Sequence, residues 1–225
     1  VVYTTNKFTF TTHVLTSKIK LVSDLMDRPN KVISNSDFSD GVGWYASSSS
    51  NTIVGGNLVN TGNGTNATPY VTTSIAKITN VGMDIYTKAR IKVTNSVSTE
   101  IRIYWYDSTN AKTYIIDDPI YTPSENTWYE FSDITSFTAN GSANIRIYHK
   151  YADAATANGK VMEVDYVITY NITDFKKAGV KNDSGTLFSR LTNDEIKDQM
   201  DIWTEVGFPD HVIAALYPDG VDSAI

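Results

Sequence analysis

The sequence predicts a mainly β protein, an antiparallel sandwich or barrel with a short helix near each end. Short runs of alternating apolar and polar residues recur from Lys31 to Asn171, and turn-rich pieces such as NTGNGTN and TANGSAN separate them. No segment in this region has helical periodicity, and many short strands without crossover helices build antiparallel sheets. The 225-residue chain suits one large domain, or one medium domain with appendages.

Composition and charge exclude several classes of function. The chain has no cysteine, which rules out disulfides, thiolate nucleophiles and zinc–thiolate sites. No run approaches the roughly 18–20 apolar residues of a membrane span, so no membrane insertion is expected. The net charge is −6, but nine acidic and only two basic residues lie from Asp183 onward, and the remainder is close to neutral. Nucleic-acid binding is therefore not expected.

The first expected element is a helix at 14–26. Its apolar residues recur at steps of four, three and four and form one stripe of about three turns: Leu15, Ile19, Val22 and Met26. The following DRPN at 27–30 ends the helix. So short a stripe is not stable alone in water. The helix is expected to pack either on its own domain or in an oligomeric stalk. If it forms a stalk, we expect a homo-oligomer, and a trimer by analogy with phage fibres.

Ten strands are expected in the β region. They cover 32–38, 43–47, 57–60, 69–73, 84–93, 100–106, 113–121, 127–133, 144–149 and 161–170. Serine-rich SSSSN at 47–51 is expected as a turn. Trp44, Trp105 and Trp128 are expected in the core or at strand edges.

The final expected element is a helix over 192–206. Thr192 is the expected N-cap, and Glu195 three residues later completes the pattern of a capping box. Ile196, Met200 and Trp203 then mark one buried face. The residues after this helix predict no particular structure.

The tetrapeptide IRIY occurs twice, at 101–104 and 145–148. Because side chains alternate along a strand, the isoleucines of both copies point to the core, followed there by Trp105 and His149. Arginine and tyrosine then point outward. The strand at 84–93 divides in the same way, so the repeat reflects the strand pattern and not a duplication.

The outward residues of these three strands are tyrosines and cations with almost no carboxylate among them. One interpretation is a solvated sheet face. The other is a recognition face, because tyrosine rings stack on sugars and guanidinium groups bind phosphate or carboxylate. The candidate ligand-binding residues are Tyr86, Lys88, Arg90, Arg102, Tyr104, Tyr106, Arg146 and Tyr148. The loops around Tyr45, Tyr70 and Tyr151 are the next candidates.

Three segments resemble the jelly-roll carbohydrate-binding modules grouped with families 4 and 9. VISNSDFSDGVGWYASSS (32–49) resembles their entry strand, NTWYEFS (126–132) a middle strand, and VMEVDYVITYNIT (161–173) their final strand. The segment that follows, which includes LTNDEIKDQMDIW, is similar to the one after such modules in bacteriophage tail and baseplate proteins. The loop KKAGVKNDSG departs from the usual pattern there, so this second likeness is looser.

The resemblance implies an eight-strand jelly roll in two antiparallel sheets over 31–172. An N-terminal stalk or linker would occupy 1–30, and a C-terminal loop and helix 173–225. It places the strands at 84–93, 100–106 and 144–149 in one sheet, so that the candidate residues share a face. It also implies a structural calcium ion with Asp165 as a ligand and Asp37 or backbone carbonyls near Ser36 as companions; calcium takes six to eight oxygen ligands.

The resemblance further implies a non-enzymatic carbohydrate-binding domain of a phage tail or receptor-binding protein. It would adhere to bacterial surface polysaccharide or teichoic acid, beside other virion proteins, in the virion or outside the cell. The alternatives are a structural or assembly domain without glycan binding, and a binding appendage of a secreted depolymerase.

Catalysis is not expected from the residues either. Asp117 and Asp118 would point to opposite faces of a strand. Glu163 and Asp165 would share a face about 7 Å apart, but two groups on one strand cannot flank a scissile bond. The three histidines have neither metal-ligand nor triad spacing. We therefore predict no catalytic residues.

Overall fold

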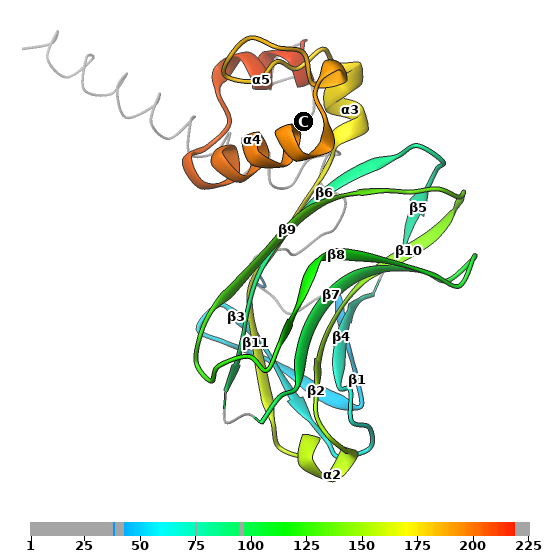
Figure 1. The fold of residues 1–225 in the computed structure, drawn as a ribbon, viewed down its shortest axis with the longest axis vertical. Coiled ribbons are helices and arrows are strands. Elements are labelled where there is room, and N and C mark those ends of the chain that lie inside the picture. Colours follow the sequence, from blue (N-terminus) through cyan, green and yellow to red (C-terminus); the bar gives the residue numbers. More distant parts are fainter. Residues whose placement is uncertain (1–37, 39–42, 75, 95–96, 219–225) are drawn as a thin grey trace, which may run out of the picture.

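The computed structural model describes residue 38 and residues 43–74, 76–94 and 97–218. Two antiparallel sheets face each other, the C-terminal helices gather at one end of this sandwich, and the short α2 (Ala154–Ala157) lies at the other end (Figure 1). The predicted helix at 14–26 lies outside the described residues, as does nearly all of the predicted strand at 32–38.

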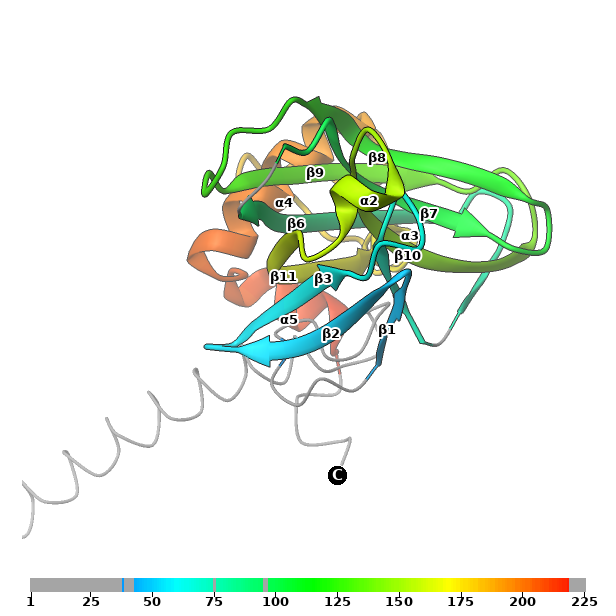
Figure 2. The ribbon, with the colours of Figure 1, turned by 90° about the horizontal axis from the view of Figure 1, so that it is seen from below.

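One sheet has six strands, five of them in the order β1-β4-β10-β7-β8, with β5 pairing with β10 beside β4. These strands are β1 (Trp44–Ser47), β4 (Tyr70–Thr73), β5 (Lys77–Thr79), β7 (Glu100–Asp107), β8 (Lys112–Tyr121) and β10 (Gly141–Lys150). The other sheet has five strands in the order β2-β3-β11-β6-β9. They are β2 (Ser49–Val54), β3 (Asn57–Gly62), β6 (Asp84–Thr94), β9 (Tyr129–Ser136) and β11 (Val161–Asn171). Figure 2 shows the two layers from below.

The chain crosses repeatedly between the two sheets. β3 and β4, β6 and β7, β8 and β9, and β10 and β11 are neighbours in sequence that belong to different sheets. This confirms the predicted two-sheet jelly-roll sandwich. Two strands were not predicted, β2 and β5. The serine-rich segment expected as a turn begins β2, because pairing with β3 over six residues outweighs its weak strand preference.

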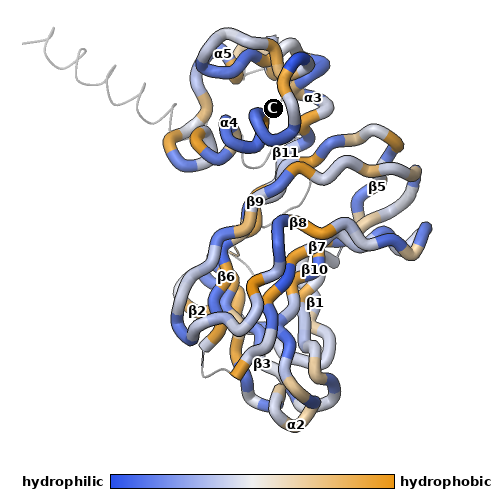
Figure 3. The backbone as a smooth tube through the Cα atoms, viewed as in Figure 1, coloured by the Kyte–Doolittle hydropathy of each residue, from blue (hydrophilic) through white to orange (hydrophobic). Residues whose placement is uncertain are grey.

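The main core lies between the sheets and follows the predicted alternation. Ile101, Ile103 and Trp105 of β7 are buried, and so are Ile145, Ile147 and His149 of β10. The inward residues of β6 face them from the other sheet. Trp44 is also buried, and Trp128 is half-buried immediately before β9. Hydrophobic and hydrophilic colours accordingly alternate along the strands in Figure 3.

Helices follow β11 and form a C-terminal helical unit. It consists of α3 (Ile172–Lys177), the 3₁₀ turn η1 (Phe188–Arg190), α4 (Asn193–Val206) and α5 (Asp210–Leu216). The predicted helix at 192–206 is confirmed by α4, whereas α3, α5 and the short α2 (Ala154–Ala157) were not predicted. All three are shorter than two turns, so their sequences carry little periodicity. Among the described residues, no helix is long and apolar enough to cross a membrane.

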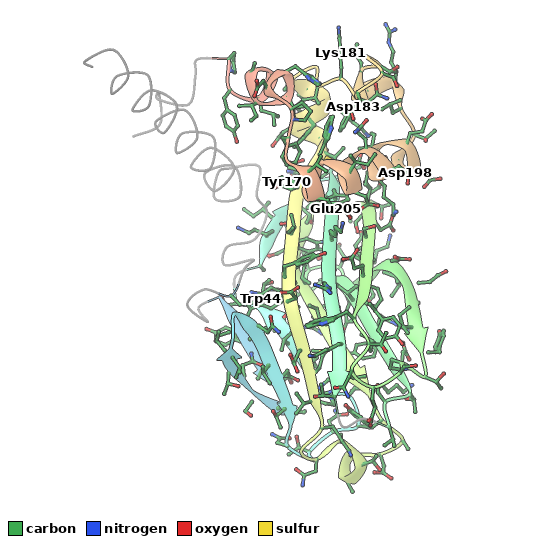
Figure 4. The ribbon with its side chains drawn as sticks, turned by 90° about the vertical axis from the view of Figure 1, so that its left-hand side faces the viewer. Trp44, Tyr170, Lys181, Asp183, Asp198 and Glu205 are labelled. Atoms are coloured by element: carbon green, nitrogen blue, oxygen red, sulfur yellow. The ribbon has the colours of Figure 1, made fainter. Side chains whose placement is uncertain are left out.

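A second hydrophobic core joins the C-terminal helical unit to the outer face of the five-stranded sheet. Tyr86, Ile134 and Tyr170 lie side by side on β6, β9 and β11. The helices cover these residues with apolar side chains: Ile172, Phe175, Val180, Phe188, Ile196, Met200, Trp203 and Val212. Figure 4 labels Tyr170 on β11 and Glu205 on α4, where the unit meets the sheet.

The start of α4 provides a first testable prediction. Thr192 Oγ1 accepts a hydrogen bond from the backbone N–H of Glu195, whose carboxylate accepts one from the N–H of Thr192. We expect Thr192→Ala to lower the free energy of unfolding by about 1 kcal/mol, because a backbone donor loses its partner. Thr192→Ser keeps the hydroxyl and is the control. Equal stability of the two variants in urea denaturation would contradict a stabilising role for this cap.

Candidate functional site

The eight predicted ligand-binding residues do not share one face. β6 belongs to the five-stranded sheet, whereas β7 and β10 pair with each other in the six-stranded sheet. The prediction that all three strands lie in one sheet is therefore wrong. Their alternation is the same, but alternation says only which side of its own sheet a residue faces, and each sheet of a sandwich has its own outer side.

Tyr86 and Lys88 of β6 are outward residues of their sheet, as predicted, but α4 covers them. Tyr86 is 0% exposed and donates a hydrogen bond to Asp201 at 2.6 Å. Burial and this hydrogen bond raise the pKa of the Tyr86 hydroxyl far above its ordinary value, so it stays protonated. Lys88 is 4% exposed and pairs with Glu205 at 2.9 Å. Neither side chain is accessible to a ligand in this arrangement.

Arg90, the third β6 candidate, is held by charges of the neighbouring strand. Its Nη1 pairs with Asp165 Oδ2 at 3.0 Å, and Lys92 pairs with Glu163 at 3.2 Å. Both cations also lie over the ring of Trp128, at 4.9 and 4.7 Å from its centroid. The outer face of the five-stranded sheet is thus a set of paired charges, and carboxylates from β11 supply the negative charge that single strands did not reveal.

The other five candidates come together on the outer face of the six-stranded sheet. Arg146 of β10 lies opposite Tyr104 of β7, and Tyr148 lies opposite Arg102. Tyr106 continues the same side of β7, and Tyr70 of β4 lies opposite Tyr148 on the other flank. We call this surface the tyrosine–arginine face; it consists of Tyr70, Arg102, Tyr104, Tyr106, Arg146 and Tyr148. All six side chains are partly exposed.

The rings of the tyrosine–arginine face pack against its cations. The guanidinium carbon of Arg146 lies 3.9 Å from the ring centroid of Tyr106 and 5.4 Å from that of Tyr70. Tyr104 and Tyr148 meet edge to face with centroids 5.9 Å apart. Contacts of this kind fix both rings and guanidinium planes before any ligand binds.

One carboxylate, Glu100, lies at the end of the tyrosine–arginine face. It pairs with Arg102, and its Oε1 accepts a hydrogen bond from the Tyr148 hydroxyl at 2.7 Å. Burial and that hydrogen bond raise the pKa of Tyr148 above its ordinary value. The prediction missed Glu100, although the signal was present: it lies two residues before Arg102 and therefore on the same side of the strand.

Two of the residues named as next candidates also lie on this side of the sheet. Tyr70 forms part of the tyrosine–arginine face, and Tyr45 of β1 extends it. Tyr45 is 63% exposed and lies opposite Thr72 of β4, which in turn lies opposite Arg146. Tyr151, by contrast, is 1% exposed and belongs to the interior.

The described residues contain no group of three or more histidine, aspartate or glutamate side chains that could hold a metal ion. Asp165 is paired with Arg90, and Asp37 lies outside the described residues. The calcium site therefore stays a prediction. Glu163 and Asp165, the two carboxylates expected to share a face of their strand, are each engaged by a cation of β6.

Comparison with protein families finds no match, and comparison with characterised proteins finds none either. Several solved structures are similar in fold. The CBM22-1 xylan-binding domain from Paenibacillus barcinonensis Xyn10C is 13% identical with a TM-score of 0.44, over 58% of this chain and 86% of that domain. A CBM4 structure is 11% identical with a TM-score of 0.44, over 57% and 94%.

An enzyme structure is similar to part of the chain as well. Arabinose-bound MgGH51 α-L-arabinofuranosidase is 10% identical with a TM-score of 0.48, over 68% of this chain. The chain spans only 30% of the length of that enzyme.

Proposed function

We propose that the protein is a non-enzymatic glycan-binding module and that the tyrosine–arginine face is its binding surface. The observation that carries this proposal is the gathering of partly exposed tyrosines and arginines on three adjacent strands, β4, β10 and β7. Tyrosine rings offer apolar faces to sugar rings at low entropic cost, and their hydroxyls and the arginines bond sugar oxygens. The resemblance of three segments to jelly-roll carbohydrate-binding modules supports the same proposal.

Binding at one such face is expected to be weak. A shallow contact on a sheet surface removes few atoms from water, and the cost of association consumes much of the gain. Adhesion then requires several copies acting together, because a second binding event on the same particle occurs at high effective concentration.

Within this function we propose attachment of a bacteriophage tail to its host. The residues after Asn171, which are similar to those that follow such modules in tail and baseplate proteins, support this setting. The ligand would be a bacterial surface polysaccharide or teichoic acid, and the protein would act in the virion, as an oligomer beside other tail proteins. A calcium ion held by Asp165 would contribute stability only, and thermal unfolding measured with and without a chelator tests it.

The test of glycan binding is a double substitution, Tyr104→Ala with Tyr148→Ala, on a glycan array and on purified bacterial cell walls. Loss of two stacking rings should weaken binding about ten- to hundredfold. The inward residues of both strands are unchanged, so the fold should persist, as circular dichroism can verify. Tyr166→Ala is the matched control, because Tyr166 is a half-buried tyrosine on the outer face of the other sheet.

Two results would contradict the proposal. If the double variant binds as well as wild type, the tyrosine–arginine face is not the binding surface. If wild type binds no glycan in any format, the structural or assembly role becomes the better explanation.

A further inference from the structure

Cations and carboxylates are unequal in number among the outward residues of β7 and β10. Arg102, Arg146 and Lys150 are cations, and Glu100 is the carboxylate among the outward residues of β7 and β10. Glu100 pairs with Arg102 and lies 3.9 Å from Lys150. This local excess of positive charge occurs in a chain whose net charge is −6, so it is not a consequence of overall composition.

Of these three cations, Arg146 is the one that has no carboxylate partner among the described residues. Its neighbours across the strands are Thr72 and Tyr104, which are uncharged. Its Nε is buried and has no hydrogen-bond acceptor. The Nε of Arg102 is buried without an acceptor as well, so the absence of a carboxylate partner is what distinguishes Arg146.

The surroundings of Arg146 also hold it in place. Its guanidinium lies near two rings, those of Tyr106 and Tyr70. A planar cation between aromatic rings loses little further freedom when it binds a carboxylate or phosphate through two parallel hydrogen bonds. A ligand at Arg102, in contrast, would have to compete with Glu100.

We propose that the glycan is acidic and that Arg146 binds its carboxylate or phosphate group, while the neighbouring tyrosines contact the sugar rings. This inference rests on the proposed function and names the ligand class of the same face. The negative group lies over the middle of β10, and the sugar chain extends across β7 and β4.

The experiment uses the full 225-residue chain on an array of neutral, uronic acid-bearing and phosphate-bearing glycans. We expect wild type to prefer acidic glycans, and the two acidic sets show whether carboxylate or phosphate is the natural group. Arg146→Gln should weaken acidic-glycan binding roughly ten- to hundredfold, the range of a charge-assisted hydrogen bond. It should also flatten the salt dependence between about 0.02 and 0.5 M salt, because screening acts on this contact.

Arg90→Gln is the matched control, since it removes the same charge from the outer face of the other sheet and should leave binding unchanged. Equal binding of wild type to neutral and acidic glycans, or undiminished acidic-glycan binding by Arg146→Gln, overturns the inference but leaves glycan binding intact. Wild type that binds no glycan overturns both. If Arg90→Gln loses as much acidic-glycan binding as Arg146→Gln, the inference is also overturned, because the loss would then reflect the net charge of the protein.

Discussion

Acidification from pH 6.5 to pH 4.5 is expected to lower the free energy of unfolding by roughly 2 kcal/mol through His149 alone. The ring of His149 is 0% exposed, between the two sheets. Its Nδ1 lies 2.6 Å from the Tyr151 hydroxyl oxygen and its Nε2 lies 3.0 Å from Asn60 Oδ1. Burial lowers the pKa of His149 to about 3.

The hydrogen bonds around His149 select a neutral ring. Asn60 Nδ2 donates to Ser49 and Asn51, so its Oδ1 is the acceptor that receives Nε2–H. The Nδ1 lone pair is then left to accept from the Tyr151 hydroxyl. A second proton on the ring would place a positive charge in the core. Neither hydrogen-bond partner of the ring, Tyr151 or Asn60, is a carboxylate that could balance this charge.

The sign of the pH effect follows from the two states. An unfolded histidine has a pKa of about 6.5, whereas the pKa of the folded His149 is about 3. Between these two values, His149 binds up to one more proton in the unfolded chain than in the folded chain. The free energy of unfolding therefore falls as the pH falls through this window, by up to about 1.4 kcal/mol per pH unit. Well above this window, His149 adds no pH dependence to it.

Urea denaturation of wild type and His149→Gln at both pH values measures this contribution, because carboxylates titrate alike in both proteins. The variant should be less stable at neutral pH but should lose roughly 2 kcal/mol less on acidification. If the variant does not fold, the ring resonances of His149 in wild-type protein serve instead. If the chemical shifts of this ring change with a midpoint at about pH 6.5, the prediction is wrong.

Trp203→Ala is expected to destabilise the C-terminal helical unit by roughly 3–5 kcal/mol. Trp203 is 1% exposed and stacks on Phe188, with centroids 5.4 Å apart and planes inclined by 6°. Its Nε1 donates to Asp183 at 3.1 Å. Alanine would leave a large cavity in the second core and remove this hydrogen bond.

The unit packs on β6, β9 and β11, which also contribute to the main core, but it has its own hydrophobic cluster. We therefore expect the helices to unfold at lower urea concentration than the sandwich, with proteolysis first in residues 178–218. Ile202→Ala is the matched control, since Ile202 is 51% exposed on the same helix and its loss should cost under about 0.5 kcal/mol. Equal urea midpoints for the two variants would refute a central role for Trp203.

The sequence by itself determined the local features of this protein. The alternation in both IRIY copies correctly assigned the buried isoleucines, Trp105 and His149, because side-chain direction in a strand follows from neighbouring residues alone. The capping box at Thr192 and the buried face of α4 were predictable for the same reason, since caps and helical stripes involve residues three or four apart.

The tertiary structure alone decided which strands pair and which outward faces remain exposed. β6 has the same pattern as β7 but lies in the other sheet, and α4 covers Tyr86 through Asp201, which is 115 residues away in the chain. The same holds for charge: Asp165 engages Arg90 from a distant strand, whereas no such partner reaches Arg146 among the described residues. These outcomes depend on contacts between distant segments, which a periodicity of two or 3.6 residues does not encode.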